Sequence, residues 1–130
     1  MVARILAGLV ALPMGLSAFN WLIDPAGAAE GLGMPFLEGA ARSTQVGDFS
    51  AFFFGVTIFC IMGAVKQQTT WLYSAAIILG LAATMRTLAW AVHGAAFVSS
   101  AVAVEVVLTV LLLISARLMS KASADSTDTD

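Results

Sequence analysis

The chain has 130 residues, of which 60% are hydrophobic and 11% are charged, and its mean hydropathy is +0.95. This composition is far more apolar than that of a soluble domain, so it predicts an integral membrane protein. Its expected partner is therefore the lipid bilayer. A net charge of −2 lacks the basic surface of a nucleic-acid-binding protein, and the lone Cys60 excludes an intrachain disulfide or a multi-cysteine metal site.

Four apolar segments, each about as long as a bilayer-crossing helix, follow one another along the chain. They cover residues 5–23, 47–65, 71–92 and 95–117. Pro13 lies in the middle of the first segment and predicts a kink of a kind that membrane helices tolerate. We therefore predict an all-α four-helix transmembrane bundle over residues 1–119, followed by a short disordered polar tail at 120–130.

The first segment also resembles a cleaved secretory signal peptide, because Arg4 precedes the apolar run and small residues follow it at 26–29. The run is longer than the usual core of ~7 to 15 residues, and Asn20, Trp21 and Asp24 form a polar helix end. The sequence leaves both interpretations open and favours a retained span.

A long first loop, at residues 24–46, contains Pro25, Pro35 and four glycines, which predict repeated breaks in helical structure. This loop either has a packing role, lying along the outer membrane–water boundary or folding over the mouth of the bundle, or forms a lid over a site. The basic residues set the orientation, since lysine and arginine favour cytoplasmic loops. One side holds Arg4, Lys66, Arg117 and Lys121, and the other holds Arg42. We expect a protein of the bacterial inner membrane with both termini cytoplasmic and the long loop outside.

Arg86 and Glu105 interrupt the third and fourth apolar segments with opposite charges. A charge near the bilayer core costs roughly 2.5 kcal/mol or more, so such residues usually face other helices and pair. At 1.5 Å per residue, Arg86 lies roughly 9 Å and Glu105 roughly 15 Å below the outer helix ends. Because the two segments are antiparallel neighbours, we expect the two side chains to meet.

Other polar residues are expected to gather near this pair in the outer half of the membrane. Trp90 and His93 share one helical face with Arg86, while Asn20 and Asp48 lie near the outer ends of the first two spans. These residues predict a small polar cavity that opens outward. Three interpretations of the pair stay open: a structural ion pair that fixes helix register, a proton or ligand site, and a contact with a partner subunit.

Small residues at helical spacing predict close contacts between helices. They are Gly47, Ala51, Gly55 and Gly63 on the second span and Gly80 on the third. The same spacing is compatible with packing inside the bundle and with a homodimer.

Together these features resemble a family of small bacterial four-helix membrane proteins of unknown function, grouped with DoxX-like proteins. The resemblance rests on the glycine- and proline-rich outer loop ending in Arg42 and Gly47, the phenylalanine-rich second span, the Met85-Arg86-Thr87 segment followed by Gly94, and Glu105. It extends to Leu118 and implies an inner-membrane bundle whose arginine and glutamate face inward. Its link to thiol redox chemistry lacks support here, because Cys60 has no paired cysteine.

No nucleophile–base pair, metal cluster or phosphate-binding loop is visible, so the sequence predicts no catalytic residue, metal or cofactor, and an enzyme is the least favoured class. The favoured function is a structural or accessory subunit of the membrane, in contact with other membrane proteins or a second copy. The alternative is a binder or carrier of a small lipid, quinone or proton-coupled solute that uses Arg86 and Glu105.

Overall fold

The computed structural model describes residues 1–127, and all its regular elements are helices. They are α1 (Val2–Ile23), α2 (Pro25–Gly31), α3 (Gly39–Lys66), α4 (Thr69–His93) and α5 (Ser99–Thr127). All except the short α2 are long and apolar enough to cross a membrane. The all-α fold with four long apolar helices is therefore confirmed, and the chain is a small integral membrane protein.

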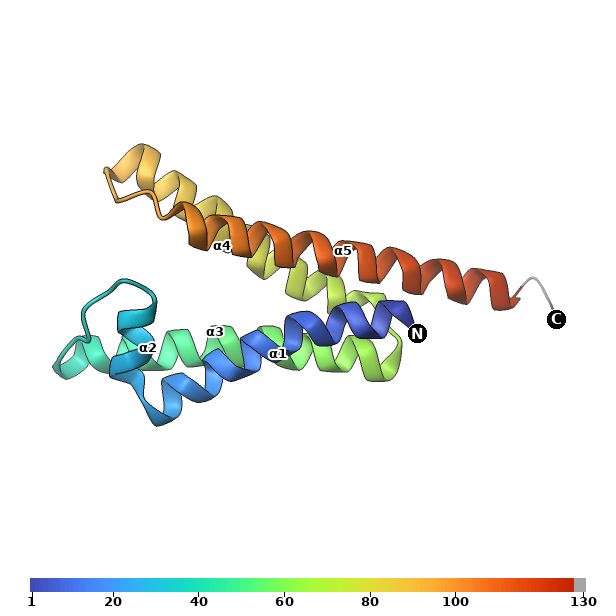
Figure 1. Ribbon diagram of the computed structural model, residues 1–130, viewed down its shortest axis with the longest axis horizontal. Coiled ribbons are helices and arrows are strands. Elements are labelled where there is room, and N and C mark those ends of the chain that lie inside the picture. Colours follow the sequence, from blue (N-terminus) through green and yellow to red (C-terminus); the bar gives the residue numbers. More distant parts are fainter. Residues whose placement is uncertain (128–130) are drawn as a thin grey trace.

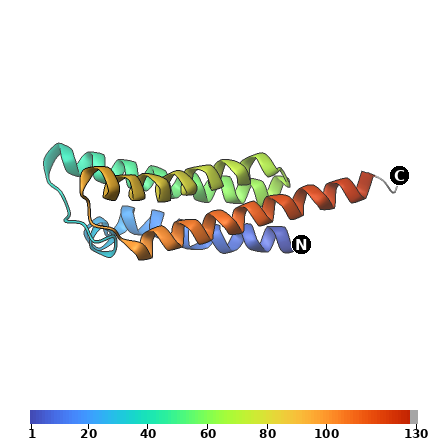
Figure 2. The ribbon, with the colours of Figure 1, turned by 90° about the horizontal axis from the view of Figure 1, so that it is seen from above.

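The four long helices form a ring in which each packs against two neighbours. Helix α1 packs against α3 and α5, and α4 packs against α3 and α5. Viewed from above, α3 and α4 lie in one layer and α1 and α5 in the other (Figure 2). The segment Met1–Ile5 and the α3–α4 turn lie at one end of the bundle, here called the terminal end; α2 and the connection at 94–98 lie at the other, the α2 end (Figure 1).

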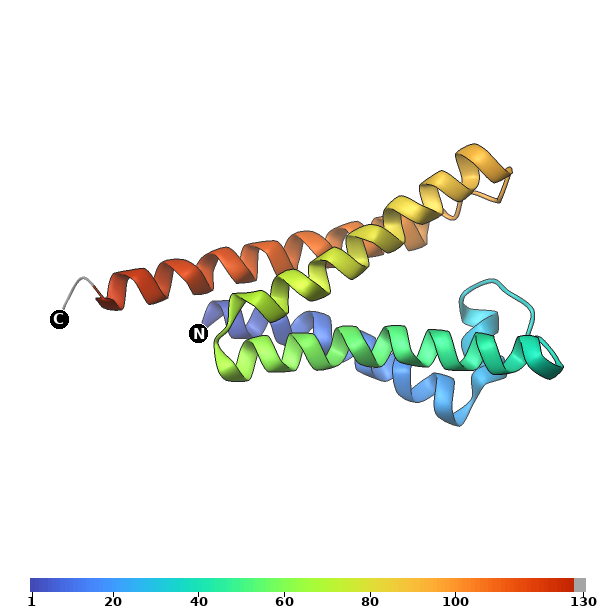
Figure 3. The ribbon, with the colours of Figure 1, turned by 180° about the vertical axis from the view of Figure 1, so that it is seen from behind.

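The two helix pairs diverge toward the α2 end. Figures 1 and 3 show the α4–α5 pair separating from the α1–α3 pair along the length of the bundle. Toward the terminal end the pairs are joined, because the Ser115 hydroxyl donates to the Ala3 carbonyl at 2.7 Å and the rings of Phe59 and Trp71 are 5.6 Å apart. The inner faces of α4 and α5 are therefore covered at one end of the molecule and less covered at the other.

Packing of α1 explains why its pair with α3 stays together along its length. Its buried residues recur every three or four positions, so they form one face. They are Ala3, Ala7, Val10, Met14, Ala18 and Trp21. The small residues allow close approach of backbones, and at the α2 end the Trp21 ring stacks on Phe49 with centroids 4.9 Å apart. Helix α1 continues through Pro13.

Several helix boundaries differ from those predicted. Helix α3 begins at Gly39 rather than 47, and α5 begins at Ser99 rather than 95 and continues to Thr127. The predicted disordered tail is therefore wrong for residues 120–127, while 128–130 lie outside the described residues. The physical reason is that hydropathy reports the apolar part of a helix, whereas backbone hydrogen bonding continues beyond the lipid boundary. Gly94, with a left-handed φ of 65°, ends α4, and residues 95–98 connect it to α5.

Most of the predicted loop at residues 24–46 is helical, in α2 and the start of α3, and the loop that connects them is residues 32–38. This loop is attached to α3 by Gln45, which is buried. Its side-chain oxygen accepts from the Leu37 amide at 3.0 Å, and its nitrogen donates to the Pro35 carbonyl at 3.0 Å. Arg42 lies over the Phe36 ring at 4.4 Å and donates to the Leu37 carbonyl. These contacts pack the loop against the first turns of α3.

Candidate functional site

Arg86 and Glu105 meet between α4 and α5, as their positions in the sequence predict. The Arg86 Nε donates to the Glu105 Oε1 at 2.8 Å. Arg86 is seven residues before the end of α4 at His93, and Glu105 is six residues after the start of α5 at Ser99. At 1.5 Å per residue both lie about 10 Å from the α2 end of their helices. The sequence predicted a greater depth for Glu105 than for Arg86, and this difference disappears because α5 begins later than predicted.

The two partners of this ion pair are covered very unequally. The Glu105 side chain is 12% exposed and the Arg86 side chain is 38% exposed. Glu105 Oε2 is buried and has no hydrogen-bond partner. The two terminal nitrogens of Arg86 donate to no other residue that the structure describes. The pair thus holds its charges together through one hydrogen bond and leaves donors of the guanidinium unused.

Arg86 lies on the continuation of the buried face of α4. We call the residues at this helical position the inner stripe. They are Leu72, Leu79, Ala83, Arg86 and Trp90. The first three are buried, with exposures of 5% or less, whereas Trp90 is 51% exposed. The stripe loses its cover from Arg86 onward because α4 leaves α3 toward the α2 end (Figure 3).

Of the other residues expected around the pair, Trp90 lies one turn from Arg86 on the inner stripe, whereas Asn20 and Asp48 lie on the other helix pair. Asn20 lines a hollow of about 180 Å³ beside α2, and Asp48 lines one of about 410 Å³ beside the loop; Arg86 and Glu105 line neither. His93 is exposed at the end of α4, and Trp90 packs on Phe97 with ring centroids 5.2 Å apart. Asn20 and Asp48 belong to the α1–α3 pair and Arg86 and Glu105 to the α4–α5 pair. Because the two pairs diverge toward the α2 end, these residues are separated. The predicted single polar cavity is not formed by these residues.

Of the small residues predicted to pack, those near the terminal end and the middle do so. A methyl group added at Gly63 would lie 2.5 Å from Leu72 Cδ2, and one added at Gly80 would lie 3.6 Å from Thr109 Cγ2. The prediction is wrong within the chain for Gly47 and Gly55, where such a methyl group would meet no atom within 4 Å.

Ala51, between Gly47 and Gly55 on the same face, is exposed. Counted at 100° per residue, this face points away from the buried side of α3, which includes Phe53, Val56 and Cys60. The three small residues therefore form a surface strip on the outside of the bundle.

Two interactions that position the helices were missed in the sequence. Ser115 ties α5 to α1, and Gln45 fastens the loop, but isolated polar residues in apolar or helical segments carry no signal of their partner. Near the pair, the Thr109 hydroxyl donates to the Glu105 carbonyl at 2.7 Å, one turn back along α5. Among the described residues no group of three or more His, Cys, Asp or Glu side chains lies close enough to hold a metal ion.

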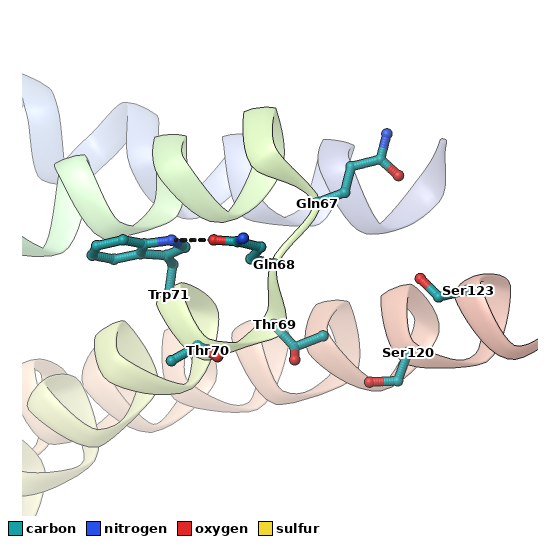
Figure 4. Close-up of a pocket in the computed structure, with 7 residues that line it drawn as sticks. All are labelled: Gln67, Gln68, Thr69, Thr70, Trp71, Ser120 and Ser123. Carbon is teal, nitrogen blue, oxygen red and sulfur yellow. Dashed lines mark hydrogen bonds between the residues drawn. The ribbon is translucent and has the colours of Figure 1, made fainter.

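A polar hollow of about 580 Å³ lies at the terminal end, away from the ion pair. Figure 4 shows its lining residues, from the α3–α4 turn, the first turn of α4 and α5. They are Gln67, Gln68, Thr69, Thr70, Trp71, Ser120 and Ser123. The Trp71 indole donates to the Gln68 side-chain oxygen at 2.9 Å, so this part of the turn is held by its own side chains.

No protein-family model, curated protein or solved structure matches this chain. The resemblance to DoxX-like proteins therefore stays a prediction.

Proposed function

We propose that this chain is an accessory subunit of the bacterial inner membrane, with both termini in the cytoplasm, and that a transmembrane helix of a partner protein covers its inner stripe. The observation that carries the proposal is the loss of cover at Arg86, where a buried stripe becomes exposed at membrane depth while retaining a charged side chain. The basic residues Arg4, Lys66, Arg117 and Lys121 at the terminal end support the orientation.

The physical reason is the cost of unused donors in a bilayer. The backbone of Arg86 lies about 10 Å below the end of α4, at a depth where hydrocarbon offers no acceptor to the terminal nitrogens of its side chain. A partner helix that presents a carboxylate, hydroxyl or backbone carbonyl would satisfy them, and charge-assisted hydrogen bonds of this kind are the stronger ones. The apolar remainder of the stripe would pack against the same helix.

The test is photo-crosslinking in native membranes with a photoreactive phenylalanine analogue at position 90. Leu88 provides the matched control, since it is 46% exposed, close to the 51% of Trp90, and two residues away it faces the opposite side of α4. We expect a discrete protein adduct from position 90 and lipid adducts alone from position 88. Equal protein adducts at both positions, or none at either, would contradict the proposal.

A second candidate is a binder of a membrane amphiphile, and the unused guanidinium donors of Arg86 favour it specifically, because arginine binds phosphate and carboxylate through several N–H groups at once. The same experiment separates the two functions. Recurrent adducts of one lipid or quinone at position 90, with no protein adduct, would favour the binder over the subunit.

A further inference from the structure

A second, larger cavity lies at the terminal end, between the first turn of α1, the end of α3 and α5. Its volume is about 720 Å³. Most of its lining is apolar, and the polar exceptions are Arg4 and Gln67. The apolar lining residues include Val2, Ile5, Leu118 and Met119. Gln67 also lines the polar hollow of Figure 4, so apolar and polar surfaces adjoin at this residue.

The position of this cavity corresponds to a membrane–water boundary. Helix α1 has 22 residues and is therefore about 33 Å long, close to the ~30 Å hydrocarbon thickness of a bilayer. Its first turn, which lines the cavity, then lies where lipid head groups begin. An apolar recess at this depth is exposed to the glycerol and first chain carbons of a phospholipid.

The charges around the cavity are predominantly positive. Arg4 lines it, and Lys66, Arg117 and Lys121 are each adjacent in the chain to a lining residue. Among the described residues at this end, the acidic side chain is that of Asp125, which already interacts with another residue. A cluster of lysine and arginine at a membrane surface attracts anionic lipids, by about 1 kcal/mol per residue.

We propose that this cavity binds one anionic phospholipid of the adjoining leaflet, with its phosphate at Arg4 and its first chain carbons against Ile5 and Leu118. The polar hollow beyond Gln67 offers amide and hydroxyl groups to the rest of the head group. This site is separate from the inner stripe, and neither depends on the other.

Native mass spectrometry of the full chain in detergent, titrated with phosphatidylglycerol or phosphatidylcholine, tests the site. We expect one phosphatidylglycerol to be retained under conditions that remove phosphatidylcholine. The change Arg4→Gln removes one charge-assisted contact and should weaken this retention about tenfold. The control Arg42→Gln, at the α2 end, should leave it unchanged.

A second pair of variants tests the cavity rather than the charge. Ala122 lines the cavity and Ala124 does not, and both are exposed, so a larger side chain at either leaves the core intact. Ala122→Phe should abolish retention of phosphatidylglycerol, and Ala124→Phe should preserve it. Equal retention of both lipids, an equal effect of the two arginine changes, or full retention in Ala122→Phe would each overturn the proposal.

Discussion

Removing one partner of the Arg86–Glu105 pair should destabilise the protein unequally, depending on which partner is lost. Arg86→Ala leaves the Glu105 carboxylate, whose side chain is only 12% exposed, without its counter-ion. Removing one partner of a buried ion pair costs about 3 to 5 kcal/mol, and the partial exposure of Arg86 places this case near the lower end, at about 3 kcal/mol. Glu105→Ala leaves the 38% exposed guanidinium, which can extend toward the boundary, so we expect a loss of about 1 kcal/mol.

The double variant identifies the coupling between the two side chains. With both charges removed, no buried carboxylate is left unpaired, and the loss should be about 2 kcal/mol, so the coupling energy is about 2 kcal/mol. The assay is reversible unfolding in mixed micelles, with Arg117→Ala, an exposed arginine, as the control expected to change little. Additive effects of the two single changes would refute the pairing, and a larger loss for Glu105→Ala than for Arg86→Ala would refute the assigned asymmetry.

Three further changes test the packing. Gly63→Ala should lower the free energy of unfolding by about 1 to 3 kcal/mol, because its methyl group would overlap the buried Leu72. Gly55→Ala, whose methyl group would meet no atom, should cause no loss and a gain of up to about 1 kcal/mol in the same micelle assay. Gln45→Ala removes both hydrogen bonds that hold the loop and should speed proteolytic cleavage between residues 32 and 38 several-fold, as measured by mass spectrometry of the fragments. Ser115→Ala removes the hydroxyl bond to α1 and should cost about 1 kcal/mol in thermal unfolding; no change would show that this bond contributes nothing net.

The contact between Arg86 and Glu105 was predictable because it depends on two adjacent segments and on the high cost of an unpaired charge in lipid. Opposite charges in adjacent apolar segments are costly to leave unpaired in lipid, so they usually pair with each other. In antiparallel helices joined by a short connection, residues at equal distances from that connection lie at the same depth. The predicted polar cavity is not formed, because it required all four helices to stay parallel. The two helix pairs diverge toward the α2 end, where Trp21 stacks on Phe49 within the α1–α3 pair, and no periodicity in the chain reports this divergence.

The small residues also show that helical spacing alone does not predict which helix faces are in contact. Spacing places Gly47, Ala51 and Gly55 on one face of a helix, but it does not say whether a neighbour lies on that face. In the structure Gly63 meets Leu72, whereas Gly47 and Gly55 meet nothing within 4 Å. Helix bounds differ for a related reason, since residues 39–46 are polar enough to lie outside the apolar span while remaining helical.

Cover of the inner stripe by a partner helix can be measured as the accessibility of Trp90 in the purified chain and in native membranes. Spin labels at Trp90→Cys and, separately, Leu88→Cys, each in a Cys60→Ala background, report collisions with dissolved oxygen. In the purified chain both labels should be accessible, because both side chains are about half exposed. In native membranes the partner helix should cover the label at position 90, so its collisions with oxygen should decrease while those of the label at position 88 stay the same. Equal oxygen accessibility of position 90 in both preparations would contradict the proposed partner helix.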